Sequence, residues 1–215
     1  MIQLALVLLA ALSLVMTLPQ AKADSGAVDK PETSKPAAIV GDAAPDFTGT
    51  DSQGRTRTLS GYNGKTVVLE WTNHECPFVR KHYDTGAMQA LQKEATDKGV
   101  IWLTIVSSAA GKQGFTTPEE ANAVIKKEKS RETARILDPK GTIGHLYGAE
   151  TTPHMYIIDS SGTLVYAGGI DDQPSVSHAT IKTAHNYVKE ALDDIAAGRA
   201  VRTPNTRSYG CGVKY

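Results

Sequence analysis

The stretch GKTVVLEWTNHECPFV, residues 64–79, decides the fold of this chain. It opens with a β-rich apolar run over residues 66–71, and such continuous hydrophobicity predicts a strand that is buried on both faces. After four polar residues come Cys76 and Pro77. Proline is favoured at the first position of a helix, because its missing N–H would be unpaired there anyway. The stretch therefore predicts a buried strand, a short turn and a helix that begins at Cys76.

A thiol at the start of a helix has the properties of a nucleophile. The unpaired backbone N–H groups and the helix dipole stabilise a thiolate, which is the reactive form of cysteine. Arg80 and Lys81 add positive charge one turn further along, whereas Glu75 opposes it. The alternative is an inert buried cysteine, which is the more common state of a lone cysteine. The position of Cys76 between strand and helix favours the reactive thiol.

Further along the chain, strand patterns alternate with helix patterns. We expect helices over residues 77–98, 118–129, 141–147 and 175–197, and strands over residues 66–71, 100–106, 134–137, 154–159 and 163–168. The turn residues between the last two strands predict an antiparallel hairpin. Strands that alternate with helices indicate an α/β domain, with a central mixed sheet flanked by helices on both faces.

The N-terminal region is predicted to be an export signal. Residues 4–18 form an apolar run that is shorter than the roughly 20 residues of a membrane span. The small residues Ala21 and Ala23 are typical of a cleavage site, so we expect cleavage after Ala23 and no membrane span in the mature protein. An uncleaved membrane anchor is the alternative. The expected parts are a signal peptide (1–23), a disordered linker (24–38), one folded domain (39–198) and a C-terminal tail (199–215).

Composition excludes several classes of protein. The 215 residues include 23 basic and 23 acidic side chains, and this balance lacks the electrostatic footprint of a nucleic-acid binder. Two cysteines are too few for a disulfide-dense mini-protein or for a four-thiolate zinc site. An exported protein would be periplasmic or secreted, where disulfides persist.

Several motifs then occur in a familiar order. They are GDAAPDF at 41–47, DSQG at 51–54, TLSGY at 58–62, the stretch at 64–79, Thr151-Thr152-Pro153, and the ending YGCGVKY at 209–215. In this order and spacing the chain resembles the redoxin branch of the thioredoxin superfamily, the alkyl hydroperoxide reductase/thiol-specific antioxidant group, and within it an exported peroxiredoxin-like subgroup. The resemblance implies a thioredoxin-like fold, in which Pro153 follows a cis peptide bond and faces Cys76.

The departures from the family pattern bear on function. A thioredoxin-type site has a second cysteine three residues after the first, where this chain has Val79. A typical peroxiredoxin carries a proline seven residues before its cysteine and a threonine three residues before it. Here these positions hold Leu69 and Asn73, and Thr72 is one residue off. The resemblance therefore implies thiol chemistry more firmly than full peroxidase activity.

The second cysteine, Cys211, lies between two glycines in the tail. If extended, residues 198–211 span on the order of 40 Å, which is enough to return across a small domain. We therefore hypothesise a Cys76–Cys211 disulfide in which Cys211 resolves the oxidised Cys76. The alternative is a permanent bond that pins the tail, for which chain entropy predicts about 5 kcal/mol of stabilisation. A reduction potential below about −300 mV would favour the permanent bond.

The predicted function is that of an exported thiol-dependent oxidoreductase, working either as a peroxiredoxin-like enzyme or by thiol–disulfide exchange. Its substrate would be a peroxide or a protein or small-molecule disulfide, its electron donor a thiol, and no cofactor is expected. Arg80 and Arg135 are the arginines considered for polarising a peroxide. Beside the catalytic Cys76 and Cys211, the residues expected to shape the substrate pocket are Thr72, Asn73, His74, Pro77, Thr152 and Pro153.

A non-enzymatic function is the alternative. The protein would then be a copper-binding or interaction module with a structural Cys76–Cys211 disulfide. His74 lies two residues before Cys76, and His154 directly follows the proline at 153. One thiolate with two imidazoles makes a plausible metal site, so Cys76, His74 and His154 are the alternative ligands.

Overall fold

The structure is a computed structural model that describes residues 38–215. The predicted signal peptide (1–23), and all but the last residue of the predicted linker (24–38), lie outside the described residues. Within the part that is described, we find no helix with the length and apolar character needed to cross a membrane.

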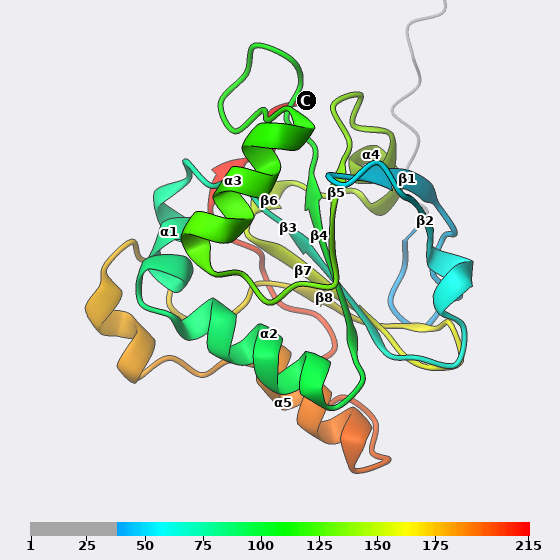
Figure 1. The fold of residues 1–215 in the computed structure, drawn as a ribbon. Coiled ribbons are helices and arrows are strands. Elements are labelled where there is room, and N and C mark those ends of the chain that lie inside the picture. The colour runs from blue at the N-terminus through cyan, green and yellow to red at the C-terminus, as the bar shows by residue number, and fades with distance from the viewer. Residues whose placement is uncertain (1–37) are drawn as a thin grey trace, which may run out of the picture. The chain divides into compact units, whose positions relative to one another are not determined.

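Seven strands form one mixed sheet in the order β2-β1-β5-β4-β3-β7-β8 (Figure 1). They are β1 (Thr48–Asp51), β2 (Thr56–Thr58), β3 (Val67–Trp71), β4 (Ile101–Val106), β5 (Ala134–Leu137), β7 (His154–Ile158) and β8 (Leu164–Gly168). β3, β4 and β5 run parallel, whereas β7 pairs antiparallel with both β3 and β8. The predicted mixed sheet and its late hairpin are thus confirmed.

Helices cover both faces of this sheet, and β3 is an interior strand between β4 and β7 with all five residues buried. The helices are α1 (Pro77–Asp84), α2 (Ala87–Asp97), α3 (Pro118–Glu128), α4 (Thr142–Tyr147) and α5 (Tyr187–Ala196). Side chains alternate along a strand, so Leu69 and Trp71 pack with α4 while Val68 packs with α1, α2 and α5. The two cores on either side of β3 fix the direction in which the strand delivers the chain to Cys76.

Two of the expected helices are shorter than predicted. The helix expected over residues 77–98 is interrupted at Gly86, whose φ of 80° is left-handed, a conformation that glycine adopts without a Cβ clash. The helix expected over residues 175–197 begins only at Tyr187, after the 3-10 helix η2 (His178–Lys182). Its N-terminus is capped by Asn186, whose side chain accepts a hydrogen bond from the N–H of Lys189. Apolar spacing continues across both interruptions, which is why the pattern did not reveal them.

Two small pieces of sheet were not predicted. The hairpin of β1 and β2 extends the main sheet beyond β5. A separate two-stranded sheet joins β6 (Thr151–Thr152) to β9 (Cys211–Gly212), at the end of the tail. In Figure 1 the red tail passes along the domain to reach β6 near the start of α1. The tail thus becomes part of the structure around Cys76.

Candidate functional site

Cys76 stands at the N-cap of α1, immediately before Pro77. Asn73 folds the preceding turn, because its backbone oxygen accepts a hydrogen bond from the N–H of Cys76 at 2.9 Å. The side-chain oxygen of Asn73 also accepts from the N–H of Glu75 at 2.9 Å. This is an Asx turn, which suits the change from strand to helix. It places the sulfur at the start of the helix, where the Cys76 side chain is 0% exposed.

The tail brings the second cysteine to the first. The sulfur atoms of Cys76 and Cys211 lie 2.6 Å apart, although 135 positions separate the two residues in the sequence. Both cysteines are thiols in this structure. A disulfide bond is about 2.05 Å long, so a small approach would join them. The structure therefore brings together the two cysteines that the sequence analysis paired.

The strand pair β6–β9 holds the second cysteine in place. Cys211 lies directly opposite Thr152 in an antiparallel pair. The peptide bond between Thr152 and Pro153 is cis, as the family resemblance implied. The carbonyl oxygen of Thr152 lies 3.2 Å from the sulfur of Cys76. The segment before Pro153 therefore contacts both cysteines, and Thr152 is the predicted pocket residue with the most direct contacts to them.

We expect the substitution Gly210→Ala to weaken the contact between the tail and β6. Gly210 has a φ of 141°, and a Cβ atom there would overlap the carbonyl oxygen of Thr152. A Cys76–Cys211 disulfide would hold the tail in this strained position. In the reduced protein the tail can separate from β6, which relieves the strain. We expect the reduction potential of the cysteine pair to rise by about 30 mV, a tenfold change in the equilibrium constant. Redox titration against glutathione would measure it.

Gly212→Ala is the matched control on the other side of Cys211. A Cβ at Gly212 would lie 3.9 Å from the carbonyl oxygen of Glu150, an ordinary contact. Equal shifts in the two variants would show that the close approach of Gly210 to β6 has no influence on the cysteine pair.

The two thiols have different acidities. Burial by itself would raise the pKa of the Cys76 thiol, but hydrogen bonding to Cys211 and the backbone N–H of Val79 outweigh it, so the pKa is lowered. Burial and the neighbouring Cys76 raise the pKa of the Cys211 thiol to about 11. Cys76 therefore loses its proton first. This order is the one required for Cys76 to be the nucleophile and for Cys211 to act second.

Two further predicted pocket residues, Thr72 and Pro77, lie directly after β3 and at the start of α1. Thr72 is buried and continues the sheet, with its N–H donating to the carbonyl oxygen of Ile105 at 3.0 Å. Pro77 is exposed at the first position of α1. Glu75 points to the neighbouring loop, where its carboxylate accepts a hydrogen bond from the N–H of Gly114 at 2.8 Å. The turn before Cys76 is thus fastened to that loop.

The alternative metal site does not form in this structure. His154 packs against the ring of Tyr156, with a centroid distance of 4.6 Å, and its Nδ1 accepts a hydrogen bond from the N–H of Glu150 at 3.3 Å. Tyr156 belongs to the core on the face of the sheet opposite to the core that contains Cys76. His74 is half-buried, and burial lowers its pKa. Across residues 38–215, no three His, Cys, Asp or Glu side chains are grouped so that they could hold a metal ion.

Both arginines considered for peroxide activation are paired elsewhere. Arg80 forms an exposed ion pair with Asp84 at 3.2 Å. Arg135 is buried and pairs with Glu132 at 2.9 Å and with Glu128 at 3.5 Å. Among the described residues, the hydrogen bonds and ion pairs of both guanidiniums go to acidic side chains, so neither is assigned a role in the reaction.

A buried cluster near the tail had no signal in the sequence. Its members come from α1, from the loop after β8 and from the tail: Lys81, His82, Asp171 and Tyr209, which we call the tail anchor. The hydroxyl of Tyr209 donates to Asp171, and it lies 3.2 Å from the Lys81 nitrogen and 3.3 Å from Nε2 of His82. Residues so far apart in sequence share no local pattern, so only the folded chain shows that they meet.

A second buried polar group, Glu70, lies within the sheet. Its carboxylate accepts hydrogen bonds from the indole of Trp102 at 2.7 Å, the hydroxyl of Tyr83 at 2.8 Å and the amide of Gln92 at 3.1 Å. Burial raises the pKa of Glu70 to about 7. In the sequence Glu70 is the one acidic residue within the apolar run at 66–71, and this is the signal that the sequence offers for it.

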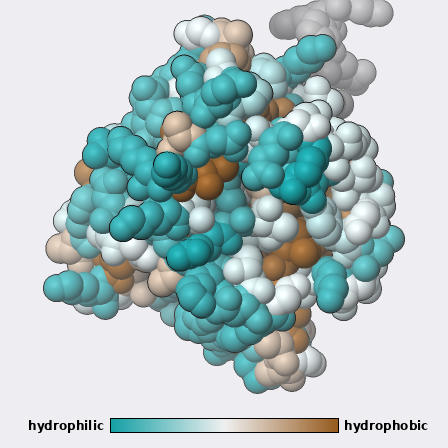
Figure 2. Space-filling model, viewed as in Figure 1, coloured by the Kyte–Doolittle hydropathy of each residue, from teal (hydrophilic) through white to brown (hydrophobic). Residues whose placement is uncertain are grey.

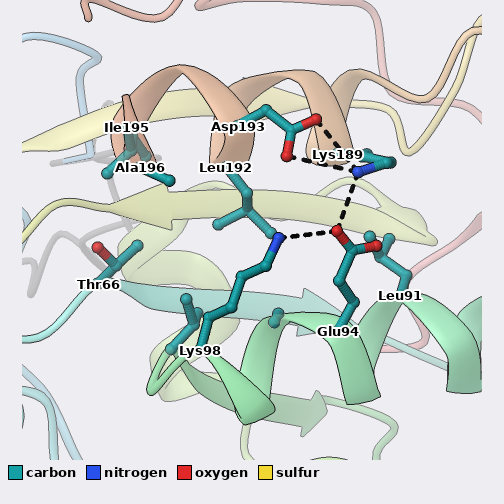
Figure 3. A pocket seen from close by; sticks show the side chains of 11 residues that line it. Thr66, Leu91, Glu94, Lys98, Lys189, Leu192, Asp193, Ile195 and Ala196 are labelled. Atoms are coloured by element: carbon teal, nitrogen blue, oxygen red, sulfur yellow. Dashed lines mark hydrogen bonds and ion pairs between the residues drawn. The ribbon is translucent and has the colours of Figure 1, made fainter. Parts of the chain in front are cut away.

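One well-formed pocket lies outside the cysteine site, between α2 and α5 (Figure 3). Its volume is about 140 Å³, and its apolar wall includes Leu91, Leu192 and Ile195. At its rim the carboxylate of Glu94 binds the ammonium group of Lys189 at 3.0 Å. On the face drawn in Figure 2 hydrophilic surface predominates, and the apolar areas are small and separate. We assign no function to this pocket.

The fold and the site together define a thioredoxin-like protein of the redoxin type, with a cysteine at a helix N-terminus beside a cis-proline segment. The AhpC/TSA family model matches residues 40–167, and the chain belongs to this family.

The chain is also similar to individual proteins. The thiol-disulfide oxidoreductase ResA of Geobacillus thermodenitrificans (strain NG80-2) is 27% identical over 137 residues, which cover 60% of this chain and 69% of that protein. An uncharacterised conserved protein from Geobacillus kaustophilus has a similar solved structure, with 26% identity, a TM-score of 0.70 and coverage of 82% of this chain and 92% of that one. A hypothetical protein from Sinorhizobium meliloti 1021 shares the fold, at 24% identity, a TM-score of 0.70 and coverage of 82% and 94%.

Proposed function

We propose that this protein is a thiol–disulfide oxidoreductase in which Cys76 is the nucleophile and Cys211 the resolving cysteine. The observation that carries the proposal is the 2.6 Å separation of the two sulfur atoms. The relatives named thiol-disulfide oxidoreductase ResA support the same class of reaction. Peroxide has less support as a substrate, because Leu69 and Asn73 replace the usual peroxiredoxin residues.

The reaction runs in two exchanges. The Cys76 thiolate attacks one sulfur of a substrate disulfide, so a mixed disulfide forms and the other substrate sulfur leaves as a thiolate, which takes up a proton. Cys211 then loses its proton and attacks the sulfur of Cys76, which releases the second substrate thiol. The substrate gains two electrons and two protons, and the protein is left with a Cys76–Cys211 disulfide. A thiol donor restores the reduced protein by the reverse chemistry.

The change in charge between the two steps favours this order. In the reduced protein the neighbouring Cys76 helps to raise the pKa of Cys211, after the larger effect of burial. Once Cys76 is bonded to the substrate, it carries no negative charge. The Cys211 thiol then loses its proton more readily, at the stage when it must act as the second nucleophile.

We propose further that the protein is exported, to the periplasm or outside the cell, because its first 23 residues have the pattern of a cleavable signal. In this proposal the mature chain comprises the linker, the domain and the tail, and it begins at Asp24. The intact mass of the protein recovered from its native host would show whether cleavage occurs after Ala23.

The function is tested with the reduced wild-type protein and a protein disulfide such as insulin. We expect one equivalent of insulin disulfide to be reduced for each Cys76–Cys211 disulfide formed, as measured by mass spectrometry. Continued turnover is expected once dithiothreitol is supplied. A reduction potential below about −300 mV, together with no oxidation by insulin, would instead support a structural disulfide.

A further inference from the structure

The tail covers Cys76 and is fastened two residues before Cys211. Tyr209 lies beside α1, where its ring meets the edge of Phe78 at a centroid distance of 5.9 Å. Its hydroxyl enters the tail anchor, whose Lys81 is 0% exposed and whose Asp171 is 3% exposed. A side chain of the tail thus takes part in a buried charged cluster formed by the domain.

The hydroxyl of Tyr209 satisfies both members of the buried ion pair. It donates to Asp171, and it lies 3.2 Å from the nitrogen of Lys81, from which it accepts. Lys81 and Asp171 are themselves 3.6 Å apart, and the backbone oxygen of Gln173 accepts a further hydrogen bond from Lys81. Buried charged groups lose considerable free energy when a partner is removed. When the tail undocks, Lys81 and Asp171 lose the Tyr209 hydroxyl as a partner, and water must replace it. This cost in free energy favours the docked state.

Beyond Cys211 the tail is held by backbone pairs and by Tyr215, whose hydroxyl donates to the carbonyl oxygen of Ala149 at 2.7 Å and whose ring stacks on His145. β9 pairs with β6, the N–H of Val213 donates to the carbonyl oxygen of Glu150 at 3.0 Å, and the carbonyl oxygen of Lys214 accepts from Ala109 at 2.8 Å. Such backbone pairs are modest in strength and occur at the end of the chain, where fraying is common. The hydrogen bonds to buried charges at Tyr209 are the stronger contacts, and they lie closest to Cys211 on its N-terminal side.

We propose that Tyr209 is a positioning residue, whose docking in the tail anchor holds Cys211 against Cys76 and keeps Cys76 covered in the reduced protein. Its part in resolving the mixed disulfide rests on the proposed function, whereas the covering of Cys76 does not. Release of the tail from the anchor is then the step that opens Cys76 to a substrate. Redocking returns Cys211 to attack the mixed disulfide.

The test is Tyr209→Phe in the reduced full chain, with the rate of alkylation of Cys76 by iodoacetamide as the readout. Only molecules with an undocked tail can react, so the rate measures the undocked fraction while docking predominates. A hydrogen bond to a charged group is worth about a 10- to 100-fold change in equilibrium. We expect Cys76 to be alkylated faster by that factor in the variant, with the modified residue identified by peptide mapping.

Tyr147→Phe is the matched control, because it also removes a buried hydroxyl, which donates to the carbonyl oxygen of Pro45 at 2.7 Å, without touching the tail. Its alkylation rate should equal that of the wild type. Amide hydrogen exchange should speed up in residues 206–215 of Tyr209→Phe and stay unchanged in β3. A wild-type rate in Tyr209→Phe, or an equal increase in Tyr147→Phe, would overturn the proposal.

The proposal and the proposed function fail in different experiments. If the wild-type protein does not reduce insulin but Tyr209→Phe still exposes Cys76, the function is wrong and the anchoring role stands. If insulin is reduced but alkylation is unaffected by Tyr209→Phe, the function stands and the anchoring role is wrong.

Discussion

Cys76→Ser is expected to reduce thiol–disulfide exchange to the rate of the buffer alone, a loss of about 10³-fold or more. A serine hydroxyl is not ionised near neutral pH and forms no bond equivalent to a disulfide. Cys211 is a poor replacement, because burial, the largest cause of its raised pKa, remains in the variant, and because it lies on the tail and not at a helix N-terminus. Steady-state reduction of insulin with dithiothreitol as donor, corrected for the reductant alone, would measure the loss.

Cys211→Ser is the informative partner of this substitution. It keeps the nucleophile at the helix N-terminus but removes the sulfur that lies 2.6 Å away. The first exchange should therefore still occur, and the mixed disulfide on Cys76 should accumulate to one equivalent. Intact-mass analysis would show an adduct that contains the substrate and is removed by dithiothreitol. If Cys76→Ser instead retained turnover, or formed the adduct through Cys211, the roles assigned to the two cysteines would be wrong.

The strand, turn and helix around Cys76 could be predicted because their signals are local. The apolar run of β3 and the proline at the first helical position lie within a few residues of each other. The cis bond at Pro153 needed the family resemblance, since nothing in the dipeptide Thr152-Pro153 separates cis from trans. The α/β class followed from the alternation of elements, which depends only on the sequence of periodic segments.

The remainder of the site depends on contacts between distant parts of the chain. That Cys211 reaches Cys76 could be proposed from tail length and flexible flanks, but the β6–β9 pair that places it joins two-residue strands with no pattern of their own. Tyr209 opens the ending YGCGVKY, but nothing in the sequence pairs it with Lys81 or Asp171. The break at Gly86 was missed for a related reason, because apolar spacing describes one face of a helix and is silent about backbone continuity.

We expect Glu70→Gln to gain stability relative to the wild type as the pH rises. Burial raises the pKa of Glu70 from an ordinary value of 4.5 to about 7. The folded protein therefore binds this proton more tightly than the unfolded chain does. The stabilisation from neutral Glu70 is complete below about pH 4.5 and is lost as the pH rises through about 7. At 1.36 kcal/mol for each pKa unit, the full loss is about 3 kcal/mol.

Glutamine remains neutral at every pH, so it removes this loss. The difference in free energy of unfolding between variant and wild type should become about 2 to 3 kcal/mol more favourable to the variant between pH 5 and pH 8. Urea unfolding of both oxidised proteins at the two pH values would measure it. Any misfit between the new amide group and the hydroxyl of Tyr83 shifts both values by the same amount and cancels in the comparison.

Glu119→Gln provides the control for this pH dependence, because Glu119 is an exposed residue in the first turn of α3. Its difference from the wild type should be nearly the same at both pH values. Buried histidines titrate equally in all three proteins, so their contribution also cancels. A difference for Glu70→Gln that does not change between pH 5 and pH 8 would mean that the carboxyl is ionised in the folded protein throughout this range. The hydrogen bonds from Trp102, Tyr83 and Gln92 would then outweigh the effect of burial, and Glu70 would be a buried carboxylate in an interior strand of the sheet.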